Sequence, residues 1–112
     1  MAKEYFDLIP VINEENSWRM DVNKNIIIQT KRQGIISRIA SKYFNRPKNK
    51  EIELDGYGSI VWQKINGKST IGDIVEEIIG ELGEEKTLAC KRAAMFFEML
   101  RFHGLIRFAG YT

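Results

Sequence analysis

The fold is decided in the stretch E51-I-E-L-D-G-Y-G-S-I-V-W-Q-K-I-N-G-K-S-T-I-G-D-I-V-E-E-I79, where the spacing of the apolar residues changes. Residues 51–54 alternate two glutamates with Ile52 and Leu54, which is typical of a half-buried strand. After Leu54 the apolar residues recur at helical spacing, and the side chain of Asp55 is placed to cap the first helix. The chain therefore changes from strand to helix near Leu54.

Three helices are predicted after this strand. The first is short and ends at Asn66-Gly67. The second begins at Thr70, which forms an acidic capping box with Asp73, and ends at Gly83. One face of the second helix is apolar and consists of Ile71, Ile74, Val75, Ile78, Ile79 and Leu82.

The third predicted helix runs from about Glu85 to His103 and ends at Gly104, which can adopt a left-handed conformation. Residues 105–108 can add a short final strand. One side of this helix carries Leu88, Met95, Phe96, Met99 and Leu100.

Two further strands are predicted before residue 51. Residues 17–22 alternate polar and apolar side chains and residues 25–30 are rich in isoleucine, so they predict a hairpin turning at Asn23-Lys24. Three antiparallel strands followed by three helices make an α+β fold with a winged helix-turn-helix-like architecture. We assign residues 1–16 to an N-terminal extension and 17–108 to a single domain.

The composition is that of a globular protein with one domain. The chain has 112 residues, of which 44% are hydrophobic and 29% charged. Its single cysteine excludes an internal disulfide, and no apolar run reaches the roughly 20 residues of a membrane span. Without a recognisable signal peptide, these features predict a cytoplasmic protein.

The side chains that catalysis requires are few. Cys90 and His103 lie 13 residues apart on the third predicted helix, which separates them by about 20 Å and prevents pairing. No phosphate-binding glycine loop occurs. Four carboxylates share one face of the second helix but lack the Glu-x-x-His partners of a di-metal site, namely Asp73, Glu76, Glu77 and Glu81. We therefore expect no catalytic residue, no metal, no cofactor and no enzymatic activity.

Charge is unevenly distributed along the chain. Residues 31–50 contain seven Lys or Arg and no acid, whereas residues 51–85 contain nine acids and two lysines. The basic segment is either a solvated crossover, part of it a short amphipathic helix before Pro47, or a contact for an acidic partner or an anionic membrane surface. The candidate contact residues are Arg38, Lys42, Arg46, Lys48 and Lys50.

Three kinds of binding protein agree with this pattern. A nucleic-acid-binding winged helix is disfavoured because phosphates would repel the acidic second helix. A peptide-binding module is favoured if residues 51–54 form an edge strand that accepts an extended peptide, with Met95 and Met99 of the third helix lining the groove. The alternative for these two methionines is core packing. A structural protein-interaction module is the third possibility.

A set of spaced residues runs from the end of the third strand to the end of the chain, namely Leu54-Asp55, Gly58, Val61-Trp62, Ile65-x-Gly67, Thr70-Ile71, Ile74, Leu100, Gly104, Leu105 and Ile106. This set resembles the pattern of the PqqD family, whose members are also called RiPP recognition elements. The resemblance covers roughly residues 17–108.

The resemblance implies a small cytoplasmic protein, a monomer or weak homodimer, that holds the leader of a ribosomally made precursor peptide. Such proteins present the leader to a modifying enzyme, often a radical SAM protein. Many members join strands two and three by a short turn, whereas about 20 residues intervene here, so the pathway is either PQQ synthesis or another peptide pathway. By position, the implied peptide contacts are Glu51, Ile52, Glu53 and Leu54 on the strand and Lys91, Arg92, Met95 and Met99 on the helix.

Overall fold

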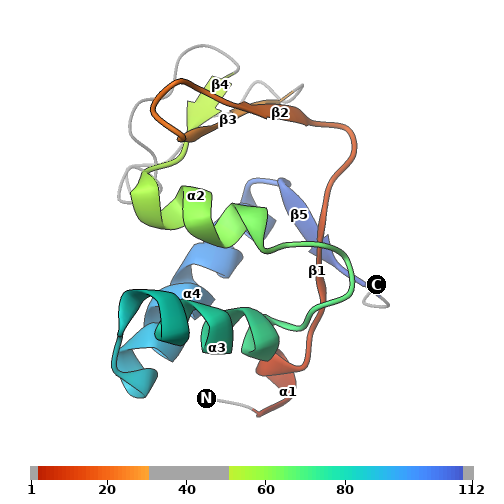
Figure 1. Ribbon diagram of the computed structural model, residues 1–112. Helices are drawn as coiled ribbons and strands as arrows, with labels where there is room; N and C mark the ends of the chain where they lie inside the picture. Colours follow the sequence, from red (N-terminus) through yellow and green to blue (C-terminus); the bar gives the residue numbers. More distant parts are fainter. Residues whose placement is uncertain (1–2, 31–50, 110–112) are drawn as a thin grey trace. The chain divides into compact units, whose positions relative to one another are not determined.

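The computed structural model describes residues 3–30 and 51–109 (Figure 1). The chain divides into two compact units. The first unit comprises Met1–Ile12 and Lys64–Thr112, and the second comprises Asn13–Gln63.

The second unit contains a three-stranded antiparallel sheet in the order β2 (Ser17–Met20), β3 (Ile26–Gln29), β4 (Glu51–Glu53). The hairpin between β2 and β3 turns at Asn23-Lys24, as predicted. Lys24 adopts a left-handed conformation with φ 66°, and the carboxylate of Asp21 accepts hydrogen bonds from the backbone N–H of Asn23 and Asn25, each at 2.9 Å. This side-chain turn replaces the Asn-Gly pair that a tighter hairpin would use.

Helix α2 (Gly56–Gln63) follows β4 and supplies the apolar cover for β3. Asp55 caps it as predicted, because its carboxylate accepts a hydrogen bond from the Gly58 N–H at 2.7 Å. The hydroxyl of Ser59 accepts a hydrogen bond from the Ile26 N–H at 2.9 Å and so ties the helix to the sheet. Fully buried side chains of this unit include Ile26, Ile28, Leu54, Val61 and Trp62.

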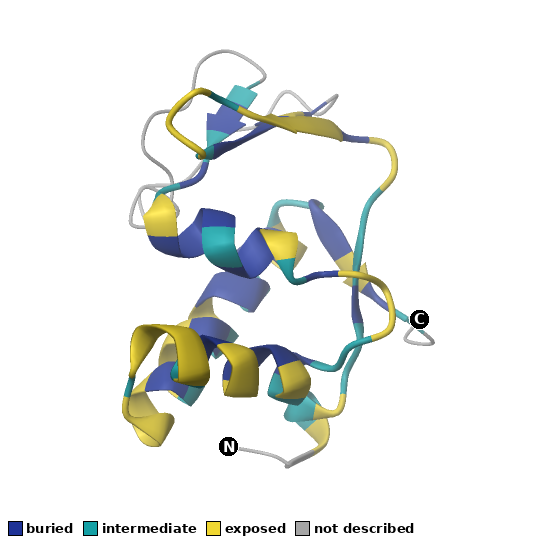
Figure 2. Cartoon of the chain, in the orientation of Figure 1, coloured by how far each residue is buried: buried dark blue, intermediate teal, exposed yellow. Residues whose placement is uncertain are grey.

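Helix α3 (Ile71–Leu82) has the ends that its sequence predicts. Thr70 and Asp73 form a capping box, and Gly83 ends the helix in a left-handed conformation with φ 67°. Figure 2 shows the helix buried along one side and exposed along the other. Leu82 is exposed despite its place in the predicted apolar stripe, since it lies at the last turn.

Helix α4 (Lys86–Phe102) and strand β5 (Ile106–Phe108) complete the first unit at its C-terminal end. The carboxylate of Glu85 caps α4 by accepting hydrogen bonds from the N–H groups of Thr87 and Leu88. Gly104 has φ 74° and reverses the chain into β5, as predicted. The core face of α4 consists of Ala89, Ala93, Phe96, Phe97, Met99 and Leu100.

The N-terminal segment is an integral part of the first unit. Helix α1 (Lys3–Phe6) is followed by β1 (Pro10–Ile12), which pairs antiparallel with β5. The carbonyl of Leu8 accepts a hydrogen bond from the Ile71 N–H at 2.9 Å, so the segment also meets the start of α3. Neither α1 nor β1 was predicted, because each is too short to show a periodic pattern.

The α+β class with a three-stranded antiparallel sheet and several helices is confirmed. None of the helices within residues 3–30 and 51–109 is long and apolar enough to cross a membrane.

Candidate functional site

Strand β4 lies at one end of the described three-stranded sheet, with β3 as its neighbour. Its register pairs Glu51 with Gln29, Ile52 with Ile28, and Glu53 with Ile27. Ile52 is buried, whereas both glutamates are half-buried, so the predicted alternation of faces is confirmed. Leu54, which follows the strand, is buried on the same face as Ile52.

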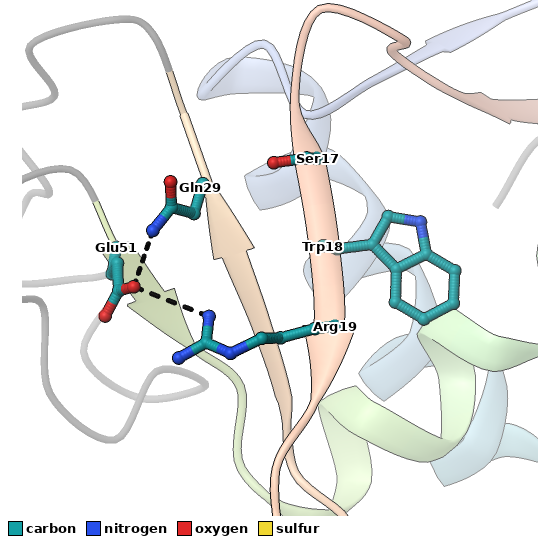
Figure 3. Close-up of a pocket in the computed structure, with 5 residues that line it drawn as sticks. All are labelled: Ser17, Trp18, Arg19, Gln29 and Glu51. Atoms are coloured by element: carbon teal, nitrogen blue, oxygen red, sulfur yellow. Dashed lines mark hydrogen bonds and ion pairs between the residues drawn. The ribbon is translucent and has the colours of Figure 1, made fainter.

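The outer face of this sheet is polar around Glu51. Its carboxylate accepts a hydrogen bond from the Gln29 side-chain amide at 2.6 Å and pairs with the Arg19 guanidinium at 3.4 Å (Figure 3). Arg19 projects from β2, two strands away from Glu51 in the sheet order. These three side chains line a pocket together with Ser17 and Trp18. The pocket could not be predicted from the sequence, because it depends on the register of three strands.

The inner face of the same sheet is apolar. Trp18, Ile28 and Ile52 occupy one cross-strand row, and the Trp18 ring meets the buried Trp62 ring of α2 edge to face at a centroid distance of 6.1 Å. Trp18 itself remains partly exposed. A strand placed beside β4 would therefore meet an apolar layer on one face and carboxylates on the other.

The helix residues implied by the resemblance do not share one environment. Lys91, Arg92 and Met95 are exposed on α4, and the Arg92 guanidinium pairs with the Glu84 carboxylate at 2.8 Å. Met99 is only 8% exposed and belongs to the core of the first unit, which is the packing alternative considered for it. Its contact with a peptide remains a prediction.

Three large apolar side chains are exposed along α4. Leu88 is 62% exposed, Met95 47% and Phe102 73%. Leu88 and Met95 were expected on the same side as Phe96, and this expectation is wrong, since small alanines occupy the core face at the N-terminal half of the helix. The seven-residue spacing of the three exposed residues places them on one face and was already present in the sequence.

A hydrogen-bonded group holds α1 against the flank of α4. The Tyr5 hydroxyl donates to the Glu98 carboxylate at 3.0 Å, and Arg101 donates to the same carboxylate at 2.7 Å. The hydrogen bonds from Arg101 lower the pKa of Glu98, although burial opposes them. Burial and the Glu98 carboxylate raise the pKa of Tyr5 well above its usual range.

The side chains considered for catalysis, Cys90 and His103, lie toward different ends of α4. Cys90 is half-buried, and His103 caps the opposite end of α4. In the described ranges no three His, Cys, Asp or Glu residues come together in a group that could hold a metal ion. The acidic face of α3 is exposed at Asp73, Glu76 and Glu77, as its helical spacing predicts.

The two predicted halves of a peptide site belong to different units. Residues 51–54 are in the second unit and residues 91–99 are in the first. The basic residues Arg38, Lys42, Arg46, Lys48 and Lys50, with the rest of segment 31–50, lie outside the described residues.

Comparison with known proteins agrees with the resemblance seen in the sequence. A family model described as coenzyme PQQ synthesis protein D (PqqD) matches residues 44–106, which is more than half of the chain. The match includes β4, α2, α3 and α4 and leaves out the β2–β3 hairpin. No curated protein and no solved structure matches the chain. The chain belongs to the PqqD family.

Proposed function

We propose that this protein is a non-catalytic adaptor that binds the leader of a ribosomally synthesised precursor peptide by strand addition to β4. It presents the leader to a modifying enzyme, such as a radical SAM protein, in PQQ synthesis or another peptide pathway. Family membership supports an accessory protein of PQQ synthesis. The observation that carries the proposal is the terminal position of β4 among the strands of residues 3–30 and 51–109, since a terminal strand is where an extended peptide can join a sheet.

The hydrogen-bond pattern of β4 identifies which backbone groups the peptide would use. The Leu54 N–H donates to the Ile26 carbonyl of β3 at 2.8 Å. Because successive N–H groups of a strand point to opposite sides, the Ile52 N–H also faces β3, and those of Glu51 and Glu53 face away from it. Strand addition would therefore use the backbone of the two glutamates.

The exposed face of α4, in the first unit, is proposed as a separate contact surface for the leader. Met95 offers an adaptable apolar contact, and Lys91 and Arg92 offer positive charge beside it. Exposed Leu88 and Phe102 extend the apolar surface in both directions along the helix. Met99 contributes by supporting the helix from the core.

A pair of substitutions at Glu51 tests strand addition. Glu51→Pro removes an N–H that faces away from β3 at the first residue of the strand, where proline is tolerated. Glu51→Ala removes the same carboxylate but keeps the N–H. Isothermal titration with leader peptides encoded beside the gene should show roughly tenfold weaker binding for the proline variant than for the alanine variant.

Equal affinities of the two variants, both shown to be folded by circular dichroism, would contradict strand addition at β4. A proline at Ile52 is less informative, because it would remove an N–H that faces β3 and disturb the sheet itself. If no leader binds the unmodified protein, the adaptor function itself is wrong.

The basic segment 31–50 is proposed as a further contact, for an acidic partner. Arg38, Lys42, Arg46, Lys48 and Lys50 would attract an acidic part of the leader or of the modifying enzyme. Replacing these five residues with glutamine should flatten the salt dependence of leader affinity while leaving the high-salt affinity unchanged. An unchanged salt dependence would remove the segment from the binding surface.

A further inference from the structure

The outer face of the β2–β3–β4 sheet becomes acidic toward β4. Within the described strands, each cross-strand row on that face ends in a glutamate on β4. Inner rows instead end in Ile52 or Leu54, which are buried. The outer rows are Ser17–Gln29–Glu51 and Arg19–Ile27–Glu53.

Both glutamates accept hydrogen bonds from side chains of β2, β3 or the turn between them. Glu51 accepts hydrogen bonds from Gln29 at 2.6 Å and Arg19 at 3.4 Å, and Glu53 accepts one from Asn25 at 3.1 Å. A carboxylate has about four lone-pair sites and can accept further donors. Side chains of a strand directly beside β4 would lie about 4.5–5.5 Å away at Cβ, nearer than Arg19 on the far strand.

We propose that β4 selects leader segments in which basic and apolar residues alternate, with Lys or Arg beside Glu51 and Glu53 and apolar residues beside Ile52 and Leu54. This inference rests on the proposed strand addition. Opposite charges in adjacent strands stabilise the pairing and like charges weaken it. The leader core that fits is therefore apolar–basic–apolar–basic, in either strand direction.

The same alternation sets the register of the bound peptide. A slip by one residue would move the basic side chains to the buried Ile52 face and the apolar ones to the carboxylates. Burying a charge against isoleucine is unfavourable, so the bound peptide can shift along β4 only in steps of two residues. The two glutamates thus act as specificity determinants and not only as solubilising residues on an edge strand.

Two matched synthetic peptides test this selection. One carries Val-Lys-Val-Lys at its centre and the other carries Val-Glu-Val-Glu, with identical flanks. Isothermal titration should show the lysine peptide binding roughly tenfold more tightly, because two favourable pairs replace two unfavourable ones. The double variant Glu51→Lys/Glu53→Lys should reverse the preference, and Glu51→Gln/Glu53→Gln should abolish it.

A charge-matched control separates local pairing from net charge. Glu76→Lys/Glu77→Lys makes the same change of charge on the exposed face of α3, in the other unit, and should keep the wild-type preference. Amide chemical shifts of residues 51–54 report whether each peptide binds at β4.

The possible failures are distinguishable. If both peptides shift the β4 amides with equal affinity, or the glutamate peptide binds more tightly, the charge selection is wrong and strand addition stands. If neither these peptides nor any leader shifts the β4 amides, strand addition fails, and the selection with it.

Discussion

Helices α3 and α4 lie in the same unit but place their large apolar side chains differently. On α3, Ile71, Ile74 and Ile78 are buried, and the exposed face is acidic. On α4, small residues fill part of the core face, while Leu88 and Phe102 are exposed. The apolar face of α3 is therefore buried within its unit, whereas α4 leaves large apolar side chains exposed on the surface of the same unit.

The largest loss of unfolding free energy should come from a substitution on the buried face of α3. Ile74→Ala removes a fully buried side chain and should lower the free energy of unfolding by about 2–5 kcal/mol. Leu88→Ala on the exposed face of α4 should change it by less than about 0.5 kcal/mol. Urea denaturation of both variants measures the difference, and comparable losses would show that Leu88 packs in the core.

Met95 and Met99 lie on the same helix, α4, but the first is exposed and the second is buried. Met99→Ala should cost about 2 kcal/mol or more of unfolding free energy, because the side chain is buried. Met95→Ala should leave stability within about 0.5 kcal/mol but weaken leader binding. Thermal melts and titration of the same samples test this division. Normal leader affinity in Met95→Ala would remove it from the binding surface.

The capping box of α3 should have an intermediate effect. Thr70→Ala removes the hydroxyl that accepts the Asp73 N–H at 3.0 Å and should cost about 1 kcal/mol. Thr70→Ser keeps the acceptor and should retain most of the stability. If alanine and serine destabilise equally in urea, the box does not stabilise the helix.

The smallest effect should be a pH dependence at Glu98 on α4. Its pKa is lowered in the folded protein, chiefly by hydrogen bonds from Arg101, so it stabilises the fold above its unfolded pKa. This contribution is lost as the pH falls through the lower folded pKa. The melting temperature of wild type should exceed that of Glu98→Gln near neutral pH, and the gap should close as the pH falls below the usual titration range of a glutamate. A gap that is constant with pH would contradict the assignment.

Local signals account for the parts of the fold that were predicted. The capping box at Thr70, the left-handed glycines Gly83 and Gly104, and the alternation of residues 51–54 each depend on neighbours within a few positions. These predictions hold in the folded protein because the contacts behind them are made between residues close in sequence, whatever the rest of the fold. The candidate strand was located by them.

Most of the features that the sequence did not predict are contacts between segments far apart in the chain. Pro10 pairs with Phe108 across nearly the whole chain, and three-residue strands carry too little pattern to indicate that partner. The contact between Arg19 and Glu51 likewise requires the register of three strands. Leu88 was assigned to the wrong side of its helix, because periodicity does not say which face meets a neighbour.

The sequence by itself determined the α+β class, the ends of α3 and α4, the strand at residues 51–53 with its two faces, and the family, because these follow from local spacing and short motifs. Only the tertiary structure decided which methionine of α4 is buried, that residues 10–12 pair with β5, and that Glu51 is reached by Arg19 from β2. Those outcomes depend on packing and register between segments distant in the chain, and no local preference specifies them.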